Sequence, residues 1–168
     1  GKMSNNNLIE VIKKRRSIRL FQNKEISNQT INEIIDCARL APTARNLQPW
    51  KFVVIKKNET LRKISEATDY GKFLKDAAVC ILVFCEDTKY YLEDGCAATE
   101  NILLASYALG IGSCWIAGDK KPYVSVISEI IGVPEGWKLV SIVALGYPAE
   151  NPSPPKKTVE QVIKWEHW

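Results

Sequence analysis

The hydrophobic positions of this chain fall into segments of two kinds. In the first kind, apolar residues recur every three or four positions, which places them on one face of a helix. This spacing predicts helices over residues 8–12, 28–41, 59–68, 90–109, 122–131 and 158–165. Pro42 ends the second of these helices and Gly132 ends the fifth.

In the second kind, apolar and β-branched residues follow one another without interruption, as is typical of strands. Such runs predict strands over residues 50–55, 77–85, 113–116 and 139–147. The run AAVCILVFC has no polar residue, so we expect a central strand buried on both faces. The pattern predicts a single α+β domain over residues 1–168. The alternation of strands and helices also leaves a doubly wound parallel sheet open, although no glycine-rich phosphate loop follows a strand.

The two ends of the chain depart from this pattern. Residues 1–7 are mostly polar and begin with Gly-Lys-Met, so we expect a disordered start that is partly derived from a cloning tag. Four prolines fall within residues 148–155. They predict that residues 148–168 form an extended C-terminal arm.

A cluster of five cations lies within residues 13–19, although the net charge of the whole chain is only +4. The cluster fits a solvated helix end, a phosphate site or a nucleic-acid contact. Its segment RRSIR (residues 15–19) offers three guanidinium groups and a hydroxyl, which match phosphate oxygens. The amide-rich loop between Pro42 and Pro49 favours the phosphate interpretation, and no RNA-binding motif supports the nucleic-acid one.

Several kinds of catalytic site lack the residues they need. The only histidine is His167, beside the C-terminus, which argues against a Ser/His/Asp or Cys/His triad and against a zinc site. Five cysteines without a C-x-x-C pair predict reduced thiols in the core of a cytoplasmic protein. No apolar run reaches the ~18 residues that cross a bilayer. An enzyme of this composition has no evident catalytic side chain or metal, so we expect a bound cofactor to supply the chemistry.

Two motifs give the chain a family resemblance. R-R-S-x-R-x-F (residues 15–21) precedes P-T-A-x-N-x-Q-P-W (residues 42–50), and one predicted helix joins them. In this order and spacing the motifs resemble those of the FMN-dependent nitroreductase family, and the resemblance covers residues 8–162. It implies a mainly antiparallel central sheet surrounded by helices, and a homodimer with FMN at the subunit interface.

The resemblance also implies cofactor contacts at twelve positions. They are Arg15, Arg16, Ser17, Arg19, Thr43, Ala44, Asn46, Ile116, Ala117, Gly118, Lys156 and Lys157. Residues 15–19 would hold the phosphate and the ribityl chain or ring edge, and residues 43–46 would come from the partner subunit. A backbone N–H near residues 117–118 would donate to flavin N5, and a lysine at 156–157 would close the phosphate site.

Some of these segments also have plainer explanations. Residues 112–118 are equally a short strand that ends in a turn, and the two lysines are equally part of a solvated tail. Many relatives carry glutamate where Ala117 stands, so a backbone contact is possible here but a carboxylate role is not. The chain also lacks the inserted helical segment of larger nitroreductases, which implies a more open pocket.

The implied function is an FMN-dependent oxidoreductase with a ping-pong mechanism. NADH or NADPH would reduce FMN, and a nitroaromatic, quinone or related small acceptor would then reoxidise it. Two other hypotheses stay open. A non-catalytic FMN-binding or sensing module would bind flavin without turnover, and a nucleic-acid-binding protein would be colourless and salt-sensitive in its binding.

Overall fold

A four-stranded sheet runs through the middle of the protein, whose structure is a computed structural model that describes residues 5–168. In their order across the sheet, the strands are β1 (Trp50–Ile55), β2 (Val79–Glu86), β4 (Trp137–Gly146) and β3 (Gly112–Ala117). All three strand pairs are antiparallel. The antiparallel sheet of the predicted α+β fold is therefore confirmed, and the parallel alternative is wrong. β1 and β3 are the two edge strands.

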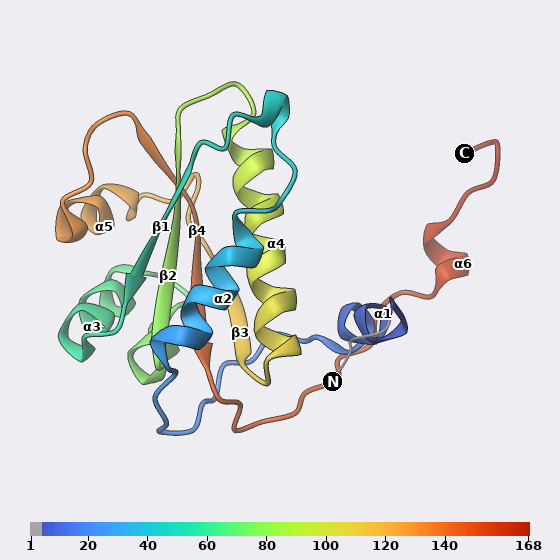
Figure 1. Cartoon of the computed structure of the whole chain (residues 1–168), viewed down its shortest axis with the longest axis horizontal. Helices are drawn as coiled ribbons and strands as arrows, with labels where there is room; N and C mark the ends of the chain where they lie inside the picture. Colours follow the sequence, from blue (N-terminus) through green and yellow to red (C-terminus); the bar gives the residue numbers. More distant parts are fainter. Residues whose placement is uncertain (1–4) are drawn as a thin grey trace.

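Helices cover both faces of this sheet (Figure 1). The four helices are α2 (Asn28–Ala38), α3 (Asn58–Ala67), α4 (Tyr91–Ala108) and α5 (Val124–Ile131). α2 and α4 cover one face, and α3 and α5 cover the other. β2 is buried on both sides because Ile81 and Val83 pack on the α2/α4 face, whereas Leu82 and Phe84 pack on the α3/α5 face. This arrangement explains the uninterrupted apolar run in the sequence.

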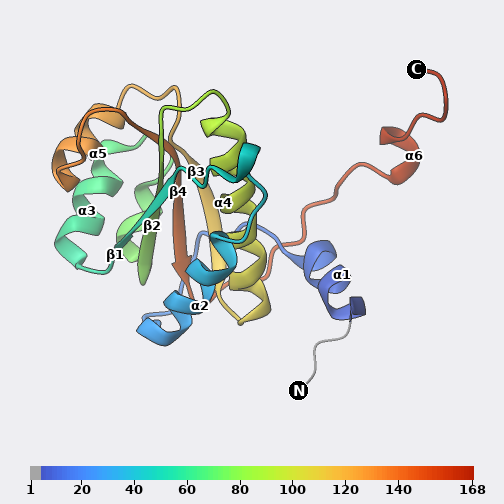
Figure 2. The ribbon, with the colours of Figure 1, turned by 45° about the horizontal axis from the view of Figure 1, so that its top comes forward.

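The remaining elements are α1 (Asn5–Lys14), the 3-10 helices η1 (Ala44–Asn46) and η2 (Lys72–Asp76), and α6 (Val159–Val162). Of the predicted disordered start, residues 1–4 lie outside the described residues, while Asn5 already belongs to α1. The helix predicted over residues 158–165 is shorter, because Ile163 takes an extended conformation with φ −97° and ψ 141°. The C-terminal arm begins packed against the segment that precedes α2, where Pro148 forms a β-bridge with Phe21 and the Ala149 N–H donates to the Leu20 carbonyl. Its later part, with α6, extends away from the sheet, as both Figure 1 and Figure 2 show.

Candidate functional site

The basic segment, residues 15–19, lies along the outer edge of β3. The backbone N–H of Ile18 donates to the carbonyl of Ser113 at 2.9 Å, and Ser17 forms a parallel bridge with Ser113. Gly112 permits this approach, because a Cβ at that position would lie 2.9–3.0 Å from atoms of the Ile18 side chain. The fold thus seats the cationic segment directly against the edge strand.

Three residues of this segment influence the pKa of Cys114 in β3. Burial raises the pKa of the Cys114 thiol, whereas the charge of Arg19, a hydrogen bond with Ser17 and the charge of Arg15 lower it. The Glu150 carboxylate raises the same pKa, and it accepts a 2.7 Å hydrogen bond from the backbone N–H of Arg19. Alternate residues of an extended segment lie on one side, so the spacing of Arg15, Ser17 and Arg19 allows all three to act on this side of β3.

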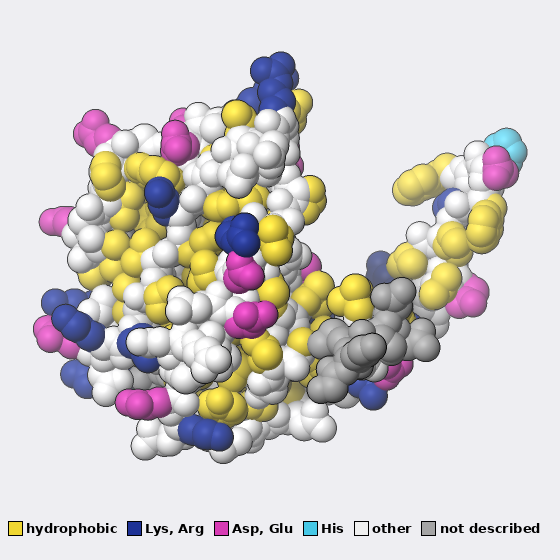
Figure 3. Space-filling view, viewed as in Figure 1, with side chains coloured by type: hydrophobic (Ala, Val, Ile, Leu, Met, Phe, Trp, Pro, Cys, Tyr) yellow, Lys and Arg dark blue, Asp and Glu magenta, His cyan; other side chains and the backbone are white. Residues whose placement is uncertain are grey.

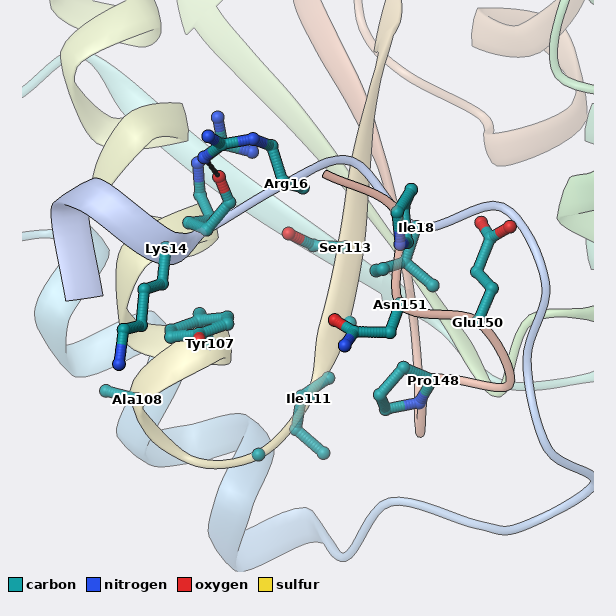
Figure 4. Close-up of a pocket in the computed structure, with 14 residues that line it drawn as sticks. Lys14, Arg16, Ile18, Tyr107, Ala108, Ile111, Ser113, Pro148, Glu150 and Asn151 are labelled. Carbon is teal, nitrogen blue, oxygen red and sulfur yellow. Dashed lines mark hydrogen bonds between the residues drawn. The ribbon is translucent and has the colours of Figure 1, made fainter. Parts of the chain in front are cut away.

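A cavity of about 390 Å³ opens beside Arg15 and Arg16, at the C-terminal end of α4 (Figure 4). It is termed here the Tyr107 cavity. Its other lining residues come from the ends of α1 and α4, the start of β3, the segments beside them and the start of the C-terminal arm: Lys14, Ile18, Tyr107, Ala108, Gly110, Ile111, Gly112, Ser113, Pro148, Glu150, Asn151 and Pro152. The arm therefore begins as part of this cavity before it leaves the sheet.

Arg16 is fixed in this cavity by its own backbone surroundings. Its Nη1 donates to the carbonyls of Lys13 at 2.9 Å and Arg15 at 2.8 Å. Its Nε is buried and has no hydrogen-bond partner within residues 5–168. A buried donor without a partner is costly, so the guanidinium is well suited to an anionic ligand.

A second cavity, of about 220 Å³, lies further along β3 and is termed the Tyr123 cavity. Its lining residues are Arg19, Tyr70, Phe73, Cys114, Trp115, Ile116, Ala117, Lys121 and Tyr123. The Tyr123 hydroxyl donates to the carbonyl of Ala117, which fixes one aromatic wall against the strand. Predicted residues Ile116 and Ala117 therefore share a cavity with Arg19, and aromatic side chains make that cavity suitable for a planar ligand.

Gly118 follows β3 directly and lies close to β4. A Cβ at Gly118 would lie 3.0 Å from the Leu139 side chain, and 3.1 Å from the Leu139 carbonyl and the Ser141 nitrogen. A side chain at this position would force the β4 backbone to shift by a few tenths of an ångström, so glycine favours the close packing of this segment against β4.

The amide-rich loop is anchored elsewhere, near the N-terminal end of α4. Thr43 Oγ1 donates to Asp94 Oδ2 at 2.8 Å, and the Ala44 N–H donates to Asp94 Oδ1 at 3.2 Å. Asp94 is buried, and the loop residues Arg45, Asn46 and Gln48 have positive φ of 55°, 55° and 53°. The loop is therefore held in a strained conformation by a buried carboxylate.

Within one chain, the loop and the basic segment line different cavities. Ala44 and Arg45 line a cavity with Lys89, Tyr90 and Asp94, whereas the basic segment lines the Tyr107 cavity. Asp94 and Tyr107 lie in the same helix, thirteen positions apart, which corresponds to about 20 Å along its axis. Figure 1 shows η1 and the basic segment near opposite ends of α4.

The other predicted site features are placed as follows. Lys156 and Lys157 are exposed in the C-terminal arm and do not line the Tyr107 or Tyr123 cavity. In residues 5–168, no three His, Cys, Asp or Glu side chains are grouped so that they could hold a metal ion. No helix in that part of the chain has the length and apolarity needed to cross a membrane.

Comparison with known proteins identifies the fold and the family. Residues 12–71 and 68–147 match the model of the nitroreductase family. This chain belongs to the nitroreductase family. It is 41% identical over 151 residues to a protein of Archaeoglobus fulgidus with the provisional name NADH dehydrogenase/NAD(P)H nitroreductase, an alignment that covers 85% of this chain and 86% of that one.

Solved structures of nitroreductases agree with this assignment. The FMN-dependent nitroreductase of Clostridium difficile R20291 has a TM-score of 0.90 and 28% identity, with 95% of this chain and 99% of that chain covered. A provisionally named nitroreductase of Desulfovibrio desulfuricans, solved in complex with FMN, has a TM-score of 0.87 and 26% identity over 98% and 99% of the two chains.

Several residues that line the two cavities could not be found in the motifs. Tyr70 and Phe73 come from the segment between α3 and β2, and Tyr107 comes from the end of α4. Glu150 and Asn151 belong to the proline-rich arm, where only Lys156 and Lys157 were predicted to bind the cofactor. Proline at position 148, directly after a strand, was the only sequence signal that the chain turns there toward the basic segment.

Proposed function

We propose that this nitroreductase-family protein binds FMN along the outer edge of β3 and uses it to oxidise NADH or NADPH. The observation that carries the proposal is the position of residues 15–19 along the β3 edge, with Arg15 lining the Tyr107 cavity and Arg19 lining the Tyr123 cavity. FMN has an anionic phosphate at one end and a flat ring at the other. The site has two guanidinium groups at one cavity and aromatic walls at the other, so its chemistry matches both ends of the cofactor.

Each part of the chain then has a distinct task in binding. Arg15 and Arg16 neutralise the phosphate in the Tyr107 cavity, and Ser17 contacts the ribityl chain. Arg19 contacts the edge of the ring, while the backbone of residues 116–118 supplies hydrogen-bond donors to it. When bound, FMN supplies the redox chemistry by taking hydride from the nicotinamide and reducing a nitroaromatic, quinone or related small acceptor in alternate half-reactions. The protein positions both partners and excludes competing reactions.

We further propose that the working unit is a homodimer. The apolar residues Leu8, Ile9 and Ile12 of α1 are about half exposed, and Trp165 and Trp168 of the arm are 76% and 103% exposed. Figure 3 shows the arm, rich in hydrophobic side chains, separated from the rest of the surface. Isolated arms with exposed tryptophans gain apolar burial only against another molecule, and a second copy of the chain presents the same features.

A two-fold axis across α4 would also complete the site. An antiparallel pair of α4 helices brings the N-terminal end of one helix to the C-terminal end of the other. The loop with Thr43, Ala44 and Asn46 would then reach the basic segment of the second copy, although it lies about 20 Å away within its own chain. Lys156 or Lys157 in the arm would add a point charge at the phosphate.

Purified protein tests this proposal directly. We expect a visible flavin spectrum with one FMN per chain, a dimer by light scattering, and steady oxidation of NADH or NADPH in the presence of menadione or nitrofurazone. If the protein holds one FMN per chain but oxidises neither NADH nor NADPH with any acceptor, it is a flavin-binding module instead. A colourless monomer that takes up no added FMN would disprove the proposal.

A further inference from the structure

A further cavity adjoins the Tyr123 cavity and is not used by the proposed FMN site. It has a volume of about 720 Å³ and is termed the Arg62 cavity. Its lining residues are Arg19, Leu20, Phe21, Asn23, Asn58, Arg62, Phe73, Lys75, Asp76, Ala77 and Ala149. Arg19 and Phe73 line both this cavity and the Tyr123 cavity, so the two hollows share a wall.

The Arg62 cavity carries an excess of positive charge. Arg19, Arg62 and Lys75 line it against one carboxylate, that of Asp76. Within residues 5–168, the side chains of Arg62 and Lys75 make no ion pair of 4.0 Å or less, so their charges are available to a ligand. Cations left without partners around a hollow of this size favour an anionic ligand.

The start of α3 adds a second feature of the same sign. α3 begins at Asn58, which lines the cavity, and no side chain caps its N-terminus. Arg62 lies one turn further along the same face of the helix. The free N–H groups and the positive end of the helix dipole therefore add to the charge of Arg62.

The size and position of the Arg62 cavity suit a second ligand beside the proposed flavin site. Pockets for small molecules typically measure ~300–1,000 Å³, and the Arg62 cavity, at about 720 Å³, lies within this range. It shares Arg19 and Phe73 with the Tyr123 cavity, which the proposed function assigns to the flavin ring. A ligand in the Arg62 cavity can therefore place a planar group at this shared wall and an anionic group near Arg62.

We propose that the Arg62 cavity binds the phosphate-bearing half of the reduced nicotinamide dinucleotide, with Arg62 and Lys75 as its phosphate contacts. This inference rests on the proposed function, because it places the nicotinamide beside the ring held at β3. The pyrophosphate is common to NADH and NADPH, and NADPH carries one further phosphate on the adenosine ribose. Arg62 is a specificity-determining residue in this arrangement and takes no part in the chemical step.

The first test measures binding without redox chemistry. ADP-ribose and 2′-phospho-ADP-ribose carry the phosphates but no nicotinamide, and their binding to the full-length protein is measured by calorimetry at low salt. R62A should weaken binding about tenfold, and R62A/K75A further, the scale of a lost charged hydrogen bond. K63A is the matched control, because Lys63 is the next residue of α3, carries the same charge and pairs with Glu59 at 3.5 Å. It should change binding less than twofold.

The second test follows flavin reduction in the FMN-loaded protein by stopped flow. NADH, NADPH and 1-benzyl-1,4-dihydronicotinamide, which has no phosphate, serve as donors. R62A should raise the apparent Kd of the dinucleotides about tenfold and leave the benzyl compound unchanged. If R62A raises the apparent Kd of NADPH but not that of NADH, Arg62 contacts the 2′-phosphate, and this result still supports the Arg62 cavity as the phosphate site.

Two results separate the possible failures. If wild-type flavin is reduced by the dinucleotides and R62A behaves like K63A, the Arg62 cavity is not the phosphate site, although the proposed function stands. Equal weakening of the benzyl compound also overturns the inference, because Arg62 would then act on the ring site. If no donor reduces the wild-type flavin, the proposed function fails. If, in addition, the wild-type protein binds neither ADP-ribose nor 2′-phospho-ADP-ribose, the Arg62 cavity is not a phosphate site either.

Discussion

Replacement of Arg15 with alanine is the sharpest test of how this chain holds FMN. The Arg15 side chain is only 20% exposed, lines the Tyr107 cavity and has one acidic neighbour, Glu100, with Nε to Oε1 at 4.0 Å. That neighbour is too distant for a strong hydrogen bond, so most of the donor capacity of the guanidinium remains for a ligand. A hydrogen bond to a charged group contributes about 1.5–3 kcal/mol, and low exposure favours the upper part of that range. R15A should therefore raise the Kd of FMN by about 100-fold, at about 1.4 kcal/mol per factor of ten.

The assay is titration of FMN into the flavin-free protein, followed by the quenching of flavin fluorescence. K13A is the control, because it removes the same charge two positions away, in a side chain that is exposed and does not line the cavity. R15K keeps the charge but loses the guanidinium fork, so its Kd should fall between those of R15A and the wild type. If R15A and K13A bind FMN equally well, only the overall positive field matters, and Arg15 is not a phosphate contact.

Further predictions concern the loop, the pH dependence of stability and the arm. D94A leaves the Thr43 hydroxyl and the Ala44 N–H without their acceptor, and should lower the free energy of unfolding by about 2–4 kcal/mol in urea titrations; unchanged stability would show that the loop is anchored by other contacts. Burial raises the pKa of Cys85 from 9.0 to about 12. The folded state therefore holds this proton more tightly, so the stabilisation is complete below pH 9 and is lost as the pH rises toward 12, by about 1.4 kcal/mol per pH unit; C85A should lack this part of the slope. Removal of residues 159–168 should shift the dimer to monomer in sedimentation at micromolar protein, and a monomeric full-length chain would remove the basis for this prediction.

Much of the fold could be predicted because apolar burial controls it directly. The run of residues 77–85 predicted a strand covered on both faces, and β2 is covered on both faces by two separate clusters. Helix lengths were predicted less well where no strong end signal exists. The helix expected to reach Pro42 ends at Ala38, because the N–H groups of Leu40 and Ala41 turn back to Cys37 and Ala38 at 3.2 Å.

The site was only partly predictable, for a different physical reason. Arg15, Ser17 and Arg19 alternate in one short segment, so a local pattern sufficed to group them. Tyr70 and Tyr107 reach the two cavities from elements far apart in the sequence, and no local spacing encodes that meeting. The role of Gly112 was also hidden, because it depends on the approach of Ile18 from nearly one hundred residues away.

In the proposed function, the edge position of β3 explains how the backbone itself can hold the redox cofactor. Every second backbone N–H and C=O of an edge strand points away from its single partner strand and needs another partner. The basic segment meets this need at Ser113, through the Ile18 N–H, and the Tyr123 hydroxyl meets it at the Ala117 carbonyl. In the proposed function, the donors that remain between these two points face the flavin ring. Such donors belong to the backbone, so they do not depend on which side chain stands at position 117. Alanine there is consequently compatible with the same contact, and A117E should leave the affinity for FMN within about threefold of wild type, whereas a proline at that position, which removes the N–H, should not.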